Sequence, residues 1–241
     1  MSVIKLDGYN LSLEDLIKVS RFNHKVELTE NAVERIKKSR AIVDDLVENE
    51  KVSYGITTGF GKFSDVVISK KDTHKLQINL IRSHACGVGN PLSEEIVRAM
   101  MLLRINALSK GYSGIRLETL QILIDMLNKG VHPIVPEKGS LGSSGDLAPL
   151  SHMVLTMIGE GEAIYKGEKM SSKDALEKAG IKPLEYLSSK EGLSLNNGTQ
   201  CMTAIGAITA YDAINLMKTA DIALGLTMEG LNGITCAMDE R

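Results

Sequence analysis

The feature that most constrains the fold is the stretch 198–231, which has no proline and few helix breakers apart from isolated glycines. Small residues recur among its isoleucines and leucines: Ala204, Gly206, Ala207, Ala210, Ala213, Ala220 and Ala223. Because small side chains let helix axes approach closely, this pattern predicts one or two long helices in the middle of a bundle. A helix of this length needs neighbours on several sides, and the preceding residues supply few of them.

The composition favours a helical core. Of 241 residues 43% are hydrophobic and 24% charged, values typical of a folded globular chain rather than a disordered one. Tryptophan is absent and aromatic residues make up only 4%, whereas there are 11 methionines. We therefore expect aliphatic, methionine and alanine side chains to fill the core, which suits packed helices better than a β-sandwich. The net charge of −2 argues against nucleic acid as a partner.

The cysteines and histidines exclude several kinds of site. There are three cysteines, Cys86, Cys201 and Cys236, an odd number without C-x-x-C spacing. We therefore expect neither a disulfide framework nor a zinc ribbon, and we expect the protein to be cytoplasmic. The five histidines show no paired-ligand spacing, so metal catalysis is not expected. There is no apolar signal segment at the N-terminus and no run long enough to span a membrane. We therefore expect a soluble protein with no membrane partner.

Capping residues and helical periodicity predict a mainly α fold with one small hairpin. The expected helices start after Ser12, Thr29, Ser93 and Asp146, and others cover about 72–84 and 117–128. The segment 163–170 predicts the hairpin. We expect two parts: residues 1–195 as an N-terminal domain carrying the active-site loops, and 196–241 as the start of a central long-helix bundle.

The loop 139–145 stands out because its seven residues contain three glycines and three serines. A Gly/Ser stretch is usually a flexible connector. Here it passes directly into a rigid helix start at Asp146–Pro149, which a plain linker does not need.

The stretch Gly139–Leu150 (GSLGSSGDLAPL) resembles the signature of the aromatic amino acid ammonia-lyases, and most closely that of the histidine ammonia-lyases. In that family an internal tripeptide cyclises to 4-methylideneimidazole-5-one. The resemblance implies that Ser143, Ser144 and Gly145 form this ring here. The Gly145 nitrogen would attack the Ser143 carbonyl, and two waters would leave, one of them carrying the Ser144 hydroxyl. Only glycine lets its nitrogen approach that carbonyl without a Cβ clash.

Four further blocks resemble the same family in the same order. They are Tyr54–Gly61, Ser83–Gly87, Arg104–Leu108 with Gly111–Gly114, and Glu191–Thr199. The resemblance implies that Tyr54 is the general base and that Ser83 and His84 bind the substrate. It also implies that Asn197 helps to hold the electrophile and the substrate.

Two departures from the family pattern matter. Ser143 stands where the family usually has alanine, so the ring would carry a hydroxymethyl group in place of a methyl group. The chain also stops at Arg241, about halfway through a typical member. We therefore expect the N-terminal part of the ammonia-lyase fold, with the remaining substrate contacts supplied by a missing C-terminal half.

Two hypotheses follow. The first is a carbon–nitrogen lyase that converts L-histidine to urocanate through the self-formed ring, with no metal or external cofactor, as a homotetramer. A phenylalanine or tyrosine lyase, or an aminomutase, is an alternative within this class. The second is a non-catalytic fragment or assembly subunit that pairs with a separate C-terminal half. On either reading the truncated chain alone is expected to be inactive.

Overall fold

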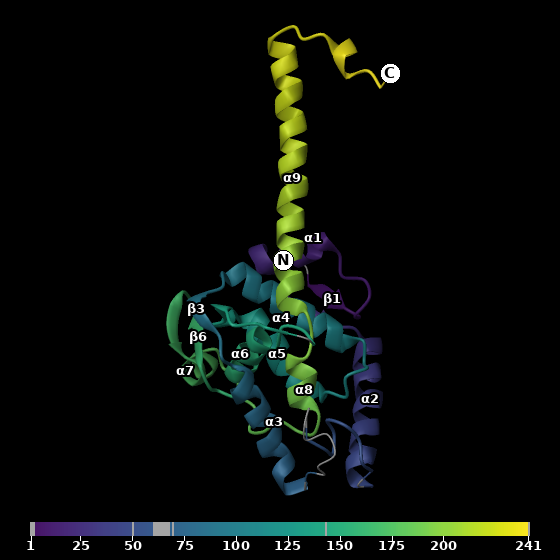
Figure 1. Cartoon of the computed structure of the whole chain (residues 1–241), viewed down its shortest axis with the longest axis vertical. Helices are drawn as coiled ribbons and strands as arrows, with labels where there is room; N and C mark the ends of the chain where they lie inside the picture. The colour runs from purple at the N-terminus through teal and green to yellow at the C-terminus, as the bar shows by residue number, and fades with distance from the viewer. Residues whose placement is uncertain (1–2, 50, 60–67, 69, 143, 241) are drawn as a thin grey trace. The chain divides into compact units, whose positions relative to one another are not determined.

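The computed structural model describes residues 3–49, 51–59, 68, 70–142 and 144–240, and the chain divides into two compact units, 1–204 and 205–241. The fold is mainly α, as predicted (Figure 1). The helices are α1 Leu13–Phe22, α2 Glu30–Glu48, α3 Lys70–His84, α4 Glu94–Ser109, α5 Leu117–Lys129, α6 Leu147–Met157, α7 Ser172–Lys178, α8 Glu191–Asn196 and α9 Gln200–Gly230. Within these described ranges no helix is both long and apolar enough to cross a membrane.

Most helix ends follow the predicted capping residues. The Ser12 and Thr29 hydroxyls accept hydrogen bonds from the backbone amides of Asp15 (3.1 Å) and Ala32 (3.2 Å), which starts α1 and α2. The expected start of α4 after Ser93 is also confirmed. However, the Ser93 side chain makes no capping hydrogen bond, and two glutamates in the first turn supply the favourable charge there instead.

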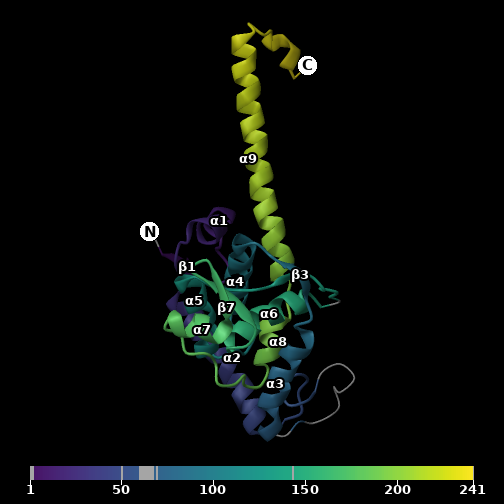
Figure 2. The same ribbon diagram turned by 90° about the vertical axis from the view of Figure 1, so that its left-hand side faces the viewer.

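The predicted hairpin is confirmed as β6 (Glu162–Tyr165) and β7 (Glu168–Ser171), which lie beside α7 in Figure 2. Lys166 and Gly167 have φ of 52° and 81°, the pair of positive values that a tight two-residue hairpin turn requires. The other strands are too short to show alternation in sequence and were not predicted. They are β4 Val131–Pro133, antiparallel to β6; β1 Ile4–Leu6, parallel to β2 Val26–Leu28; and β3 Val88–Pro91, antiparallel to β5 Pro136–Lys138.

Helix α4 forms the centre of the first unit, where it packs against α1, α2 and α5. Ten of its sixteen residues are buried. The expected methionine core is confirmed by the fully buried side chains of Met100, Met101, Met126, Met153 and Met157. The expectation is wrong for α9, where Met202 and Met217 are exposed.

A buried arginine on α4 joins the ends of two helices. The Arg98 guanidinium donates to the carbonyls of Val19 (2.8 and 3.0 Å) and Leu127 (3.2 Å), near the ends of α1 and α5. It also lies 3.0 Å from His132 Nε2, so this nitrogen accepts and Nδ1 carries the proton, 3.5 Å from Glu94. Burial, reinforced by the Arg98 charge, lowers the pKa of His132 to about 4.

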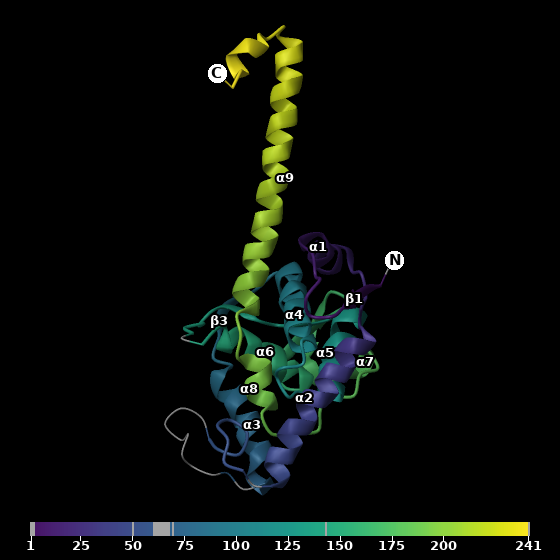
Figure 3. The same ribbon diagram turned by 90° about the vertical axis from the view of Figure 1, so that its right-hand side faces the viewer.

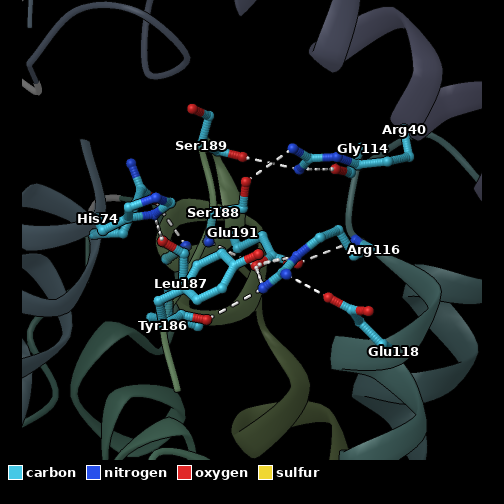
Figure 4. Close-up of polar contacts among 12 residues, drawn as sticks. Arg40, His74, Gly114, Arg116, Glu118, Tyr186, Leu187, Ser188, Ser189 and Glu191 are labelled. Atoms are coloured by element: carbon cyan, nitrogen blue, oxygen red, sulfur yellow. Dashed lines mark hydrogen bonds and ion pairs between the residues drawn. The ribbon is translucent and has the colours of Figure 1, made fainter. Parts of the chain in front are cut away.

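A second polar cluster anchors the segment 186–191, which leads into α8 (Figure 4). The fully buried carboxylate of Glu191 accepts hydrogen bonds from Arg116 Nη2 (2.8 Å), Nε (3.0 Å) and backbone amide (3.1 Å), and from the Ser188 amide (2.8 Å). The Arg116 guanidinium also stacks on the Tyr186 ring at 4.5 Å. The start of α8 is therefore tied to the start of α5.

Two further side chains hold the same segment from other elements. Arg40 of α2 donates to the Ser189 carbonyl (3.1 Å) and the Ser188 hydroxyl (2.9 Å), and His74 Nδ1 of α3 donates to the Leu187 carbonyl (2.9 Å). One turn further along α3, the buried Gln77 accepts from the Gly192 amide at 2.8 Å. Figure 3 shows α3 and α8 side by side, as these contacts require.

We predict that replacing Glu191 with alanine lowers the free energy of unfolding by about 3–5 kcal/mol. The substitution removes the buried counter-ion of the largely buried Arg116 guanidinium. Urea unfolding followed by circular dichroism measures this. Glu118→Ala is the matched control: Glu118 also pairs with Arg116, but its side chain is 67% exposed. We expect it to lose less than about 1 kcal/mol. Equal losses for the two variants would contradict the assigned role of Glu191.

The His132 environment predicts a pH dependence of stability. An unfolded histidine titrates near pH 6.5, whereas folded His132 titrates at about 4. Between these values the unfolded chain binds the proton and the folded chain does not. The folded state should therefore lose up to about 3 kcal/mol as the pH falls through this window, and nothing above it. A His132→Gln variant should show a shallower decline in urea unfolding between pH 6.5 and 4, and an unchanged slope would contradict this.

Candidate active site

The base of the glycine–serine loop rests on the backbone that follows α3. Strands β3 and β5 pair Val88 with Lys138, immediately before the loop. Gly139 has φ of 115°, and a Cβ built on it would lie 3.1 Å from the Gly87 Cα atom. The Gly87 amide in turn donates to His152 Nε2 on α6 at 3.0 Å. The base of the loop and α6 therefore both contact Gly87, just beyond the end of α3.

The far end of the loop contacts a second backbone turn, at Asn197–Gly198. Gly145 has φ of 128°, and a Cβ there would overlap the Gly198 carbonyl oxygen and lie 2.6 Å from its carbonyl carbon. The Asp146 amide donates to the same carbonyl at 2.6 Å. The structure thus brings predicted site residues Gly145 and Asn197 together through adjacent backbone, and leaves the Ser144 side chain exposed.

Two sequence-predicted parts of the site fall outside the described residues. One is Ser143, the first residue of the predicted ring tripeptide. The other is Phe60–Gly61, the end of the glycine-rich loop that carries Tyr54. The ring role of Ser143 stays a prediction.

Asp146 caps a different helix from the one predicted. It precedes α6, but its side chain makes no capping bond there. Instead, Oδ2 accepts from the Met202 amide in the first turn of α9 at 2.8 Å, 56 residues away in sequence. Burial, together with this carboxylate, raises the pKa of the neighbouring Cys201 thiol to about 11, so the thiol is protonated at neutral pH. Asp146 therefore locks the glycine–serine loop to the start of α9.

The turn 197–199 between α8 and α9 presents Asn197 outward. The Asn197 amide donates to the Leu193 carbonyl at 3.0 Å, and its side chain is exposed. The preceding Asn196 is buried and donates to the Ser151 hydroxyl on α6 at 3.3 Å. The inward asparagine fixes the turn to α6, and the role of the outward one as a ligand-binding residue stays a prediction.

Beneath this turn lies Arg104, which begins one of the blocks that resemble the family but was given no role from the sequence. It is 5% exposed, and its guanidinium donates to Gln200 Oε1 at 2.8 Å and to the Ser194 carbonyl. Burial lowers the pKa of Arg104 to about 10. The available signal was that the otherwise apolar run 96–105 contains two charged residues, Arg98 and Arg104, because a charged side chain is buried only with hydrogen-bond partners.

Ser83 and His84 lie in the last turn of α3. His84 Nδ1 is 2.8 Å from the Leu80 carbonyl, which also accepts from the Ser83 hydroxyl at 2.9 Å. A carbonyl only accepts, so Nδ1 carries the proton and Nε2 of the neutral ring is an acceptor. The half-buried ring is thus held in one tautomer.

Tyr54 lies at the opposite end of α3 from His84. It belongs to a turn closed by the Ile56 and Thr57 amides, which donate to the Ser53 carbonyl. The Thr57 carbonyl accepts from the amide of Ile68, two residues before α3 begins. Fifteen helical residues separate the two ends, about 20 Å along the axis. One chain therefore does not bring Tyr54 and His84 together, and the role of Tyr54 as base stays a prediction.

This arrangement is that of a mainly helical protein whose glycine–serine loop closes on a second backbone turn. The sequence matches the family described as aromatic amino acid lyase over residues 11–241, and the chain belongs to that family. In the described ranges no three histidine, cysteine or acidic side chains cluster as metal ligands would.

Individual relatives agree with this assignment. The chain is 66% identical over its whole length to a histidine ammonia-lyase of Alkaliphilus oremlandii, of which it covers 47%. The crystal structure of histidine ammonia-lyase from Trypanosoma cruzi superposes with a TM-score of 0.91 at 38% identity, over 99% of this chain and 46% of that one. A phenylalanine aminomutase of Pantoea agglomerans gives 0.89 at 40% identity, over 98% and 45%. The chain spans about half the length of these relatives.

We predict that Gly198→Ala lowers the free energy of unfolding by about 1–3 kcal/mol, the usual cost of overpacking. Its Cβ would overlap Arg104 Nη1 and Gln200 Oε1. Gly206→Ala on α9 is the control, because a Cβ there meets nothing within 4 Å and alanine is about 0.5–1 kcal/mol better than glycine in a helix. Thermal unfolding of both variants measures the difference. A neutral Gly198→Ala would show that the turn is not tightly packed.

Proposed function

We propose that this chain is the N-terminal half of a histidine ammonia-lyase, which eliminates ammonia from L-histidine to give urocanate. The observation that carries the proposal is the backbone contact of Gly145 with Gly198, in a chain that matches the lyase family over residues 11–241. The contact supports the proposal because Gly145 is a predicted electrophile precursor and Gly198 follows Asn197, the residue expected to hold electrophile and substrate.

The described residues fit a 4-methylideneimidazole-5-one derived from Ser143, Ser144 and Gly145. The left-handed φ and lack of Cβ space at Gly145 require glycine, the residue whose nitrogen must close the ring. The Asp146 amide and carboxylate restrain the loop just after it. The ring, once formed, supplies an electrophile that makes the substrate nitrogen a better leaving group. No other cofactor is needed.

The His84 tautomer supports histidine as the substrate. With Nδ1–H held by Leu80, the neutral ring offers Nε2 as an acceptor. The imidazole of histidine carries an N–H donor that the phenyl ring of phenylalanine lacks. A site with a hydrogen-bond acceptor in place therefore favours histidine, because the phenyl ring would leave that acceptor unpaired.

The turn that carries Tyr54 is bonded to the chain just before α3, whereas His84 ends that helix, and this separation supports a site shared between chains. Because the length of α3, about 20 Å, separates the Tyr54 turn from His84, we propose that a second copy brings its own Tyr54 to this site. The exposed apolar side chains of α9 supply a surface for such assembly: Ile214, Leu216, Met217, Ile222, Leu224 and Leu226. We propose a homotetramer whose long helices pack together with those of the C-terminal half.

A cytoplasmic location completes the proposal. Cys86, Cys201 and Cys236 are all free thiols, two of them exposed, as expected of a protein that works under reducing conditions.

Joining residues 1–241 to the C-terminal half of the Alkaliphilus oremlandii relative tests the function. We expect the purified chimera to be lighter than its sequence mass by two water molecules, to absorb in the near ultraviolet, and to release ammonia and urocanate from L-histidine. Ser144→Ala, which has no hydroxyl to eliminate, should keep one of those waters, lose the absorbance and release no ammonia. Intact-mass spectrometry and product analysis with L-histidine, L-phenylalanine and L-tyrosine provide the readout.

The outcomes separate the alternatives. If a folded, tetrameric chimera has the full mass of its sequence, with no water lost, the lyase proposal is overturned. The chain would then be an assembly subunit without the ring. A formed ring with a β-amino acid as product would indicate an aminomutase. Preference for phenylalanine or tyrosine would overturn the role given to His84.

A further inference from the structure

Arg104 bridges the two sides of the turn that carries Asn197. Its Nη2 donates to the Ser194 carbonyl, three residues before Asn197, and its Nη1 donates to Gln200 Oε1, three residues after it. The guanidinium is planar and rigid, so bonds from its two ends set the span of the turn. A lysine ammonium, a single point charge, cannot reproduce this fork.

The Arg104 guanidinium contacts Gly198, and Gly198 in turn contacts Gly145. On one side, Gly198 leaves no space for a Cβ above Arg104 Nη1. On the other side, its carbonyl contacts Gly145 and accepts from the Asp146 amide. Any movement of the guanidinium is therefore transmitted to the glycine that closes the predicted ring.

The charge state of Arg104 argues against a purely structural role. In the part of the chain that the structure describes, no carboxylate pairs with Arg104, and its buried Nε has no hydrogen-bond partner. A buried cation without a counter-ion costs stability, and a neutral side chain could serve the same acceptors. Arg98, six residues earlier on α4, bonds helix-end carbonyls in the same way but lies away from this turn.

We propose that Arg104 is a positioning residue: it holds the Asn197–Gly198 turn against the Gly145 loop and so fixes Asn197 at the electrophile. Its effect on the reaction rests on the function proposed above. Its effect on the turn does not, and can be measured in this chain alone.

Amide hydrogen exchange of residues 1–241 tests the structural step. In Arg104→Lys we expect the Asp146 and Met202 amides, whose acceptors are the Gly198 carbonyl and Asp146 Oδ2, to exchange about tenfold faster than in the parent chain. Arg104→Met, which also removes the charge, should give at least the same increase. The matched control is Arg98→Lys, which should leave these two amides unchanged.

Equal exchange at the two amides in the Arg104 and Arg98 variants would overturn the proposal. So would a uniform acceleration of every amide in Arg104→Lys, because this would show a global loss of stability rather than release of the turn.

A double-mutant cycle in the complete chimera tests the catalytic consequence. If Arg104 acts through Asn197, Arg104→Lys should lower kcat about tenfold in the parent but less than about twofold in an Asn197→Ala background. Arg98→Lys should have the same effect in both backgrounds. Additive effects of Arg104→Lys and Asn197→Ala in an active enzyme would overturn the positioning role. An inactive parent chimera would overturn the proposed function instead, and the exchange data would still decide whether Arg104 holds the turn.

Discussion

The glycine–serine loop and the Asn197 turn depend on two glycines, Gly145 and Gly198, that meet backbone to backbone although they lie 53 positions apart in sequence. A Cβ on Gly145 would overlap the Gly198 carbonyl, and a Cβ on Gly198 would overlap the side chains of Arg104 and Gln200. The amide of Asp146 closes the contact with a hydrogen bond, and the carboxylate of the same residue holds the first turn of α9. One aspartate therefore fixes both the end of the glycine–serine loop and the start of the longest helix. Backbone contacts of this kind are stiff, which suits a segment expected to condense upon itself.

The protein surrounds this contact with buried polar groups rather than with apolar packing alone. Arg104 lies beneath the Gly198 turn, Glu191 anchors the start of α8, and Gln77 ties α8 to α3. Each acts through directional hydrogen bonds, whereas aliphatic and methionine side chains only fill volume. Directional hydrogen bonds specify where a turn lies, and these bonds are stronger in the low dielectric of the protein interior than in water. Burying these polar side chains costs desolvation free energy. Here they fix the position of the 197–199 turn.

Sequence reasoning recovered what local chemistry determines. The caps Ser12 and Thr29, the long helix after Gly198 and the hairpin at 163–170 each follow from side chains within a few residues of the feature, and all were predicted. The parts that could not be predicted are non-local. The short strands outside the hairpin show no periodicity, and the carboxylate of Asp146 serves a helix 56 residues away. Likewise, nothing in the local pattern at Arg104 reveals which carbonyls it meets. The resemblance to a family supplied the candidate residues, but not the contacts that hold them.

The length of α3 is the basis of the assembly proposed above. Fifteen helical residues separate the ends of α3 by about 20 Å. The predicted recognition histidine lies in its last turn, and the turn of the predicted base is bonded to the chain just before its start. Bending cannot close this distance, because α3 is tied to the chain before and within α8 by His74 and Gln77. If both residues act on one substrate, they must come from different chains. The rigidity of α3 is thus the physical reason for the oligomer proposed above, in which a second copy supplies the tyrosine.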